Sequence, residues 1–368
     1  MATTSDASAA VASSQQLAPS AWMKHGIAKP ENAVVLTIRK GGPGKSSLTL
    51  MLADAFVRLG LNVLVIDTDP QGNATLGLDS KVKMVEGGQD RFGKSFEVPD
   101  RFTVVDVIQN GEDGVLSEAV QIVDWGHDPQ APFVKGGPLR PGSLGVAGIV
   151  PCYEAIEGIA KQWSLGDLVK LKRALHNPAT PGELAPNALW DVVLIDTPPG
   201  GTDIGRMAVH AANKALLLTT AEPFGMDAIG QTHRYLEDIR INYSHPDLQT
   251  IGLLLSSYNP RLRQTKAQLA DFNQAQLSGH SVANVDLWPE RIPGRTVVPE
   301  SQSYRAPISA FLGEGQNVQA AKVLCQVAES VALRILDRIQ HPMADQLHKE
   351  WQQAWPGELT PYATGGPS

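Results

Sequence analysis

The sequence has little cysteine and no long apolar run. Its 368 residues include only Cys152 and Cys325, which excludes a disulfide framework and a zinc site built from paired cysteines. Each cysteine is expected to fill buried apolar space in a reducing compartment. No stretch reaches the ~18 uninterrupted apolar residues of a membrane span, and residues 1–20 lack the cationic leader and apolar run of a secretory signal. We therefore expect a soluble, cytoplasmic protein with no membrane partner.

Positive charge is also scarce. The formal net charge is -7, so any contact with nucleic acid must come from a local basic patch rather than from the whole surface. With 42% hydrophobic residues, 34 Gly and 26 Pro, the composition excludes a coiled coil, a collagen and a wholly disordered chain. The length allows two domains of ~150 residues or one larger α/β domain with insertions and tails, and we favour the second.

Short apolar runs without alternation predict strands that are buried on both faces of a parallel sheet. Such runs stand at residues 33–38, 63–66, 192–195, 215–218 and 251–255. Apolar residues at helical spacing predict helices over residues 48–59 and 318–339. The expected fold is α/β, with a mostly parallel central β-sheet that has α-helices on both faces.

The organisation along the chain follows from the same patterns. Residues 1–30 lack apolar periodicity and predict a flexible N-terminal arm, and residues 341–368 predict a fraying C-terminal tail. The folded body is expected over residues 31–340. Stretches rich in Pro and Gly predict loop insertions around residues 121–145 and 177–186.

The most informative segment is KGGPGKSS, residues 40–47, which lies between a predicted strand and a predicted helix. In a phosphate loop, glycines let backbone N–H groups approach phosphate oxygens, the lysine reaches the β- and γ-phosphates, and the serine ligates Mg²⁺. A glycine-rich turn without this role would not need the strand, the Lys-Ser pair and the helix together. The predicted nucleotide-binding residues are Gly41, Gly42, Gly44, Lys45, Ser46 and Ser47. Two residues depart from the general pattern: Arg39 replaces the first glycine, and Pro43 removes an N–H donor.

Acidic residues follow two of the predicted strands. Asp67 and Asp69 belong to DTDPQGN at residues 67–73, and Asp196 ends the apolar run of VLIDTPPG at residues 193–200. Both segments fall at the carboxyl edge of the sheet, where such folds bind ligands. An acid placed there can hold Mg²⁺ beside phosphates. The alternative is an ordinary polar strand end or a turn cap.

These three motifs in this order resemble the ParA family of Walker-type DNA-partition ATPases, which belong to the deviant-Walker class with MinD. Similarity continues through residues 222–230, 258–261 and 292–307, and covers most of residues 31–340. The resemblance implies an ATPase with ATP and Mg²⁺ as cofactors. It also implies an ATP-dependent homodimer whose two nucleotide states differ in their affinity for partners.

Residue roles come with the resemblance. Lys40 is the signature lysine that reaches the partner's nucleotide, Lys45 contacts the phosphates, and Asp69 positions the attacking water. Ser46, Asp67 and Asp196 support Mg²⁺, and Pro293 lies near the adenine.

The family also binds DNA without sequence preference and works with a ParB-like adaptor, close to the nucleoid. The candidate DNA-binding residues are Arg261, Arg263, Lys266, Arg291, Arg295 and Arg305. One departure is that Thr296-Val297 stands where relatives often carry an arginine. A MinD-like, membrane-associated ATPase is the alternative, but the chain ends in TPYATGGPS rather than in a basic amphipathic helix. An electron-transfer ATPase would need cluster-binding cysteines in the expected loops, and neither Cys152 nor Cys325 lies in such a loop.

Overall fold

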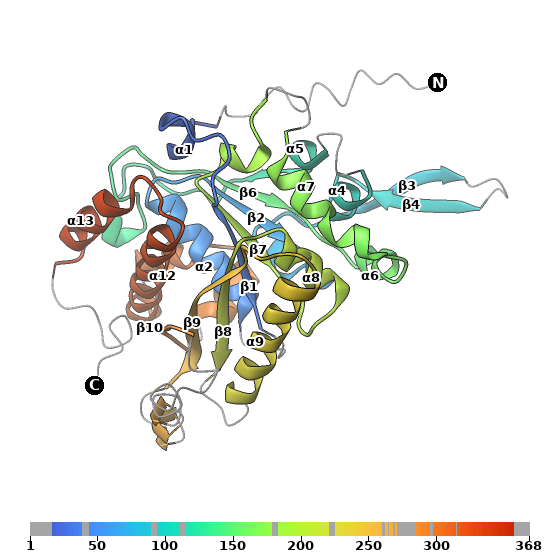
Figure 1. Cartoon of the computed structure of the whole chain (residues 1–368). Helices are drawn as coiled ribbons and strands as arrows, with labels where there is room; N and C mark the ends of the chain where they lie inside the picture. Colours follow the sequence, from blue (N-terminus) through green and yellow to red (C-terminus); the bar gives the residue numbers. More distant parts are fainter. Residues whose placement is uncertain are drawn as a thin grey trace.

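The protein is built around a twisted central sheet (Figure 1). The computed structural model describes residues 17–38, 44–89, 94–110, 115–178, 183–220, 225–259, 262–263, 265–267, 269–270, 285–294, 297–313 and 315–356. The strand order is β10-β9-β8-β1-β7-β2-β6-β5, and all neighbours are parallel except β5 and β6. The strands are β1 (Ala33–Thr37), β2 (Val63–Asp67), β5 (Gln121–Val123), β6 (Ala147–Val150), β7 (Val192–Asp196), β8 (Lys214–Thr220), β9 (Gln249–Tyr258) and β10 (Leu287–Pro293).

Helices cover both faces of the sheet, which confirms the predicted α/β fold. Alternate residues of β1 enter two separate apolar cores, with Val34 and Leu36 in one and Ala33 and Val35 in the other. The first core is closed by α1 (Ala21–Lys24), α2 (Lys45–Arg58), α11 (Val297–Tyr304), α12 (Val318–Arg338) and α13 (Ala344–Ala354). The second is closed by α4 (Val104–Asn110), α5 (Val115–Ala119), α6 (Ala155–Ala160), α7 (Lys170–His176), α8 (Asp203–His210) and α9 (Gly225–Asn242). None of the described helices is long and apolar enough to cross a bilayer.

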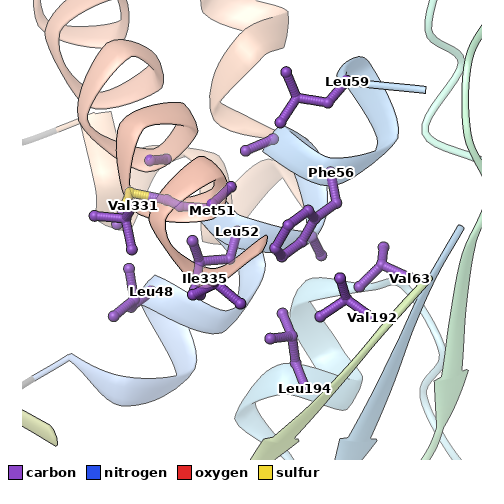
Figure 2. Packing of buried hydrophobic residues seen from close by; sticks show 14 of the residues in the cluster. Leu48, Met51, Leu52, Phe56, Leu59, Val63, Val192, Leu194, Val331 and Ile335 are labelled. Atoms are coloured by element: carbon purple, nitrogen blue, oxygen red, sulfur yellow. The ribbon is translucent and has the colours of Figure 1, made fainter. Parts of the chain in front are cut away.

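Helix α2 is buried between the sheet and α12 (Figure 2). Its Leu52 and Phe56 are fully buried and belong to the same core as Val192 of β7 and Val331 of α12. Burial of a large apolar side chain stabilises a fold by ~1.5–3 kcal/mol. These contacts fix the position of α2, whose first residue is Lys45.

The N-terminal segment differs from the flexible arm predicted through residue 30. Trp22 of α1 is buried, and its Nε1 donates to the Asp191 carbonyl at 2.9 Å. The Ala21 N–H donates to the Asp191 carboxylate at 2.6 Å. A single aromatic anchor and a capped turn leave no periodic signal in the sequence, so residues 20–24 were expected to be free, and that expectation is wrong.

The C-terminal segment is likewise packed where fraying was expected. Helix α13 places Trp351 and Trp355 in the first core, and both indole N–H groups donate to Glu329 Oε2 at 2.7 Å. The fraying tail is therefore wrong for residues 344–355. The limits of the ATPase body, 31–340, stay a prediction.

Two features fall outside the predicted elements. A hairpin of β3 (Met84–Gln89) and β4 (Ser95–Pro99) projects from the body (Figure 1). Strand β5 lies inside the stretch predicted as a loop insertion and pairs with β6. The described connections also contain short 3-10 turns, at Phe133–Lys135, Leu165–Val169, Pro186–Leu189 and Ile308–Leu312. Strand β5 was not predicted because its three residues are too few to show a sequence pattern.

A buried ion pair connects the far end of α2 to the C-terminal helices. Arg58 and Glu329 are fully buried and approach to 2.5 Å. Arg58 also donates to the carbonyls of Phe133 and Gly137. Burial raises the pKa of Glu329, and the Arg58 charge acts against that shift. A buried ion pair of this kind makes each partner depend on the other.

We expect Arg58→Met to destabilise the fold by ~3–5 kcal/mol, because Glu329 is then buried without its cation. Urea unfolding followed by circular dichroism measures the change. The Arg58→Met/Glu329→Leu double variant, which removes both charges, should lose less than the single variant. A single variant within ~1 kcal/mol of the wild type would contradict the assignment.

Candidate functional site

The ends of three adjacent strands place the acidic residues of the sequence motifs together. Asp67 of β2 and Asp196 of β7 are paired in register, and both are fully buried. Thr68 donates its N–H and its hydroxyl to the Asp196 carbonyl at 3.0 and 2.6 Å. Thr197 donates to the Leu36 carbonyl of β1 at 2.7 Å. These hydroxyls hold the carboxyl ends of β1, β2 and β7 in fixed positions.

The first turn of α2 brings a lysine to these carboxylates. Gly44 precedes the helix with φ +85°, a left-handed conformation that favours glycine. Lys45 begins the helix and is only 6% exposed. Burial lowers the pKa of Lys45, whereas the charges of Asp196 and Asp69 raise it. Lys45 is thus a buried cation beside two of the candidate carboxylates.

Asp196 has one carboxylate oxygen available for a ligand. Its Oδ1 accepts from Thr49 Oγ1 at 3.3 Å, and its buried Oδ2 has no hydrogen-bond partner among the described residues. Burial, followed by the charge of Asp67, raises the pKa of Asp196 to about 7, although a hydrogen bond with Ser46 and the Lys45 charge act against the shift. A serine hydroxyl beside an unpartnered buried carboxylate oxygen is a donor set that suits Mg²⁺. The residues present therefore fit a magnesium ion.

Asp67 is bound differently. Its Oδ2 accepts from the N–H and the hydroxyl of Thr75, both at 2.8 Å, and its Oδ1 accepts from the Asp69 N–H at 2.9 Å. Burial raises the pKa of Asp67 to about 6 despite these hydrogen bonds. Thr75 lies in α3 (Asn73–Gly77). The contacts of Asp67 therefore favour a role in fixing the loop and α3 over direct coordination of a metal.

Asp69 lies at the edge of this group. It is 6% exposed, and its Oδ1 accepts from the Gln71 N–H at 3.0 Å. Burial raises the pKa of Asp69, and the nearby Lys45 lowers it. The DPQG turn that follows brings Gly72 close to Cys152, since a Cβ at Gly72 would lie 3.1 Å from the Cys152 carbonyl oxygen.

The other predicted nucleotide-binding residues have different outcomes. Lys40, Gly41 and Gly42 lie outside the described residues. Ser47, in the first turn of α2, accepts from Gln302 Nε2 of α11 at 2.9 Å. Pro293 is buried at the end of β10, at the same edge of the sheet as Asp196.

The candidate DNA-binding residues separate in the same way. Arg263 and Lys266 are exposed, as a DNA-binding surface requires, while Arg261 and Arg295 lie outside the described residues. Arg305 is paired with Asp79 at 2.5 Å.

The expectation for Arg291 is wrong. This residue is only 7% exposed, and its guanidinium donates to the carbonyls of Trp288 and Glu290. Burial lowers its pKa. A side chain used in this way contributes to no exposed basic surface.

Three contacts at the site were not predicted from the sequence, those of Thr49, Thr75 and Gln302. Thr49 lies one helical turn after Lys45, so helical spacing could have placed it there. Thr75 and Gln302 approach the site only through the tertiary fold, and neither has a local signal in the sequence.

The site has the features of phosphate-loop nucleotide-binding proteins. These features are a strand, a positive-φ glycine, a buried lysine at a helix start and two strand-terminal carboxylates. Residues 34–308 match the sequence profile of the CobQ/CobB/MinD/ParA nucleotide binding domain, and the chain belongs to this family. The resemblance to the ParA family is thereby confirmed.

Individual relatives agree with this assignment. The chain is 26% identical over 302 residues to the chromosome-partitioning ATPase Soj of Thermus thermophilus, covering 82% of this chain and 96% of Soj. Among solved structures, apo McdA of Cyanothece has a TM-score of 0.56 at 16% identity, with 81% of this chain and 98% of that chain covered. MinD of Pyrococcus horikoshii, complexed with Mg-ADP, has a TM-score of 0.52 at 20% identity, with 82% and 97% covered. At these identities the structural likeness shows the fold alone.

The raised pKa of Asp196 predicts a pH dependence of stability. A carboxyl whose pKa is higher in the folded than in the unfolded state stabilises the fold below its ordinary pKa, 3.8, and that stability is lost as pH rises through about 7. Asp196→Asn removes this titration. In thermal unfolding from pH 4.5 to 8, without Mg²⁺ or nucleotide, the midpoint temperature of the variant should therefore rise relative to that of the wild type as pH rises. Parallel midpoint profiles would contradict the prediction.

Proposed function

We propose that this protein is an ATP-driven dimerising switch for the partition or positioning of plasmid or chromosomal DNA, or of another cargo. The observation that carries the proposal is the buried group of Lys45, Asp196 and Asp69 at the carboxyl edge of a parallel sheet. Membership of the family supports the nucleotide, and relatives named for chromosome partitioning support the task.

The assignment of residues to ATP follows from their positions. Lys45 and the N–H groups at the start of α2 bind the β- and γ-phosphates, where the helix dipole also favours negative charge. Ser47 adds a hydroxyl in the same turn, and Pro293 contacts the adenine. Ser46 and Asp196 hold Mg²⁺, with Asp67 in support through the loop that it fixes. The metal ion neutralises charge on the phosphate oxygens.

Hydrolysis of ATP requires an aligned water more than a covalent intermediate. Asp69 is the residue proposed to align that water, since its carboxylate lies beside Lys45 but outside the network that binds Asp67. Lys40 of a second copy reaches the same nucleotide and stabilises the dimer. Loss of the γ-phosphate removes contacts that hold the two copies together.

The output of the switch is binding to DNA. Exposed Arg263 and Lys266, together with Arg261 and Arg295, supply positive charge for a sequence-independent contact with phosphates. A ParB-like adaptor bound to the cargo stimulates hydrolysis and releases the dimer.

The test combines oligomeric state, DNA binding and membrane binding on one preparation. Light scattering after size exclusion should give a dimer with Mg²⁺ and an uncleavable ATP analogue, and a monomer with ADP. A DNA shift assay should give binding only in the dimeric state, with an affinity that falls steeply with salt. Sedimentation with anionic liposomes should leave the protein in the supernatant.

Two variants assign the residues. Lys45→Ala should lose nucleotide binding, because no other described cation lies among the buried carboxylates. Asp69→Ala should bind ATP, accumulate as a dimer and lose at least ~100-fold in turnover. The matched control is Asp106→Ala, which changes an acid at the start of α4.

A monomer at saturating Mg²⁺ and analogue would refute the dimerising switch. Binding to liposomes instead of DNA would favour the MinD-like alternative. Undiminished turnover of Asp69→Ala would remove Asp69 from its proposed role.

A further inference from the structure

Helices α3 and α11 end in the same unusual way. In each, a residue within two positions of the helix end has a positive φ without being glycine, with φ +52° at Asp79 and +51° at Arg305. The hydrogen bonds also correspond. Ser80 N–H donates to the Thr75 carbonyl and Ala306 N–H to the Ser301 carbonyl, both at 3.0 Å. This is the Schellman arrangement, in which the left-handed position is usually glycine.

A charged residue at such a position strains the backbone relative to glycine, and arginine tolerates it less well than aspartate. Here the two strained residues are bound to each other, because Arg305 and Asp79 form an ion pair at 2.5 Å. The side chains are 46% and 63% exposed, so the pair adds little to the stability of the fold. Because Gln340 has the same strained turn outside the site, the strain alone assigns no role, and a role of the ion pair follows only from what the pair connects.

Helix α3 connects this ion pair to the candidate site. Thr75, whose carbonyl closes the turn at Asp79, is also the residue that donates twice to Asp67. Gly77 lies against α2, since a Cβ there would be 2.3 Å from Leu50 Cδ1. The position of α3 therefore depends on its contact with α2 and on the ion pair at its end.

Helix α11 reaches α2 as well. Gln302 Nε2 donates to Ser47 Oγ in the first turn of α2, two residues after Lys45. Gln302 and Arg305 thus connect α11 to the two segments that carry the candidate residues. One is the helix that begins with Lys45, and the other is the loop of Asp67 and Asp69 that continues into α3.

We infer that α11 is a brace, made by Gln302 and Arg305, which holds α3 at a fixed position relative to the start of α2. The inference rests on the proposed function, and its residues are positioning residues that touch neither ATP nor Mg²⁺. The brace keeps Asp69 aligned with Lys45. Lys45 and Ser46 stay on α2 when the brace is broken, so nucleotide affinity is retained while alignment of the water is lost.

The expected effect is a split between kcat and KM. Arg305→Gly removes the ion pair and relieves the backbone, so the variant should be at least as stable to heat as the wild type. Its kcat should fall about 2–5-fold, the size expected for losing one exposed ion pair, with KM for ATP within about twofold. Arg305→Lys, which keeps the charge, should restore most of kcat.

The experiment compares these variants with Asp79→Gly, the double glycine variant and a matched control. The control is Gln340→Gly, because Gln340 (φ +56°) ends α12 with the same hydrogen-bond pattern and belongs to no part of the site. Hydrogen exchange of nucleotide-free protein should be about 2–5-fold faster over residues 73–80 in Arg305→Gly and unchanged there in Gln340→Gly. ATPase assays are run without DNA, so that a DNA contact of Arg305 does not enter.

If Arg305 and Asp79 act only through their ion pair, the effects of the two substitutions on kcat are not additive. The kcat of the double glycine variant should then be no lower than that of either single variant. Unchanged exchange over residues 73–80 in Arg305→Gly would overturn the inference, and so would a full kcat in that variant. A wild type that neither binds nor hydrolyses ATP would instead refute the proposed function, and the exchange measurement would then decide alone whether Arg305 holds α3.

Discussion

The site depends on the burial of two carboxyl groups side by side. Register pairs Asp67 with Asp196 at the ends of adjacent strands, where both carboxyls are removed from water. Burial raises the pKa of both. Such an arrangement is costly unless cations or hydrogen-bond donors compensate for it. Asp67 is compensated by Thr75 and a backbone N–H, whereas Asp196 retains an oxygen without a described partner.

Helix α2 is the element that joins this site to the rest of the fold. Its first residue, Lys45, faces the carboxylates, and its last residue, Arg58, is buried against Glu329. Between them, Leu52 and Phe56 bury the helix against the sheet and α12. A buried charge at each end and an apolar middle leave the helix little freedom to shift. The phosphate-binding end is therefore positioned by contacts made across the whole first core.

Much of this could be predicted from the sequence, because the strands that meet at the site are continuous apolar runs and their polar ends carry the motifs. Residues 63–66 and 192–195 predicted β2 and β7 to within one residue, and with them the meeting of Asp67 and Asp196. Anchors without periodicity were missed. Trp22 and Trp351 bind through single indole N–H groups to partners more than twenty residues away, which no local pattern encodes.

The sequence also could not predict which of the candidate basic residues are buried or paired in the fold. Arg291 was expected on a basic surface, yet it is buried and donates to backbone carbonyls. Arg305 is exposed as expected, but it is paired with Asp79. The difference is set by tertiary neighbours, since the two residues lie in the same short stretch of chain. Arg263 and Lys266 are also exposed as expected.

The central claim is that the buried carboxyl of Asp196 belongs to a Mg²⁺-nucleotide site. Titration calorimetry at pH 6.5, in buffers of different ionisation enthalpy, counts the protons released when Mg-ATP binds. With a pKa of about 7, Asp196 is mostly protonated before binding and must ionise beside the metal. The account predicts that the wild type releases about three-quarters of a proton more than Asp196→Asn. Equal release by the two proteins would contradict it.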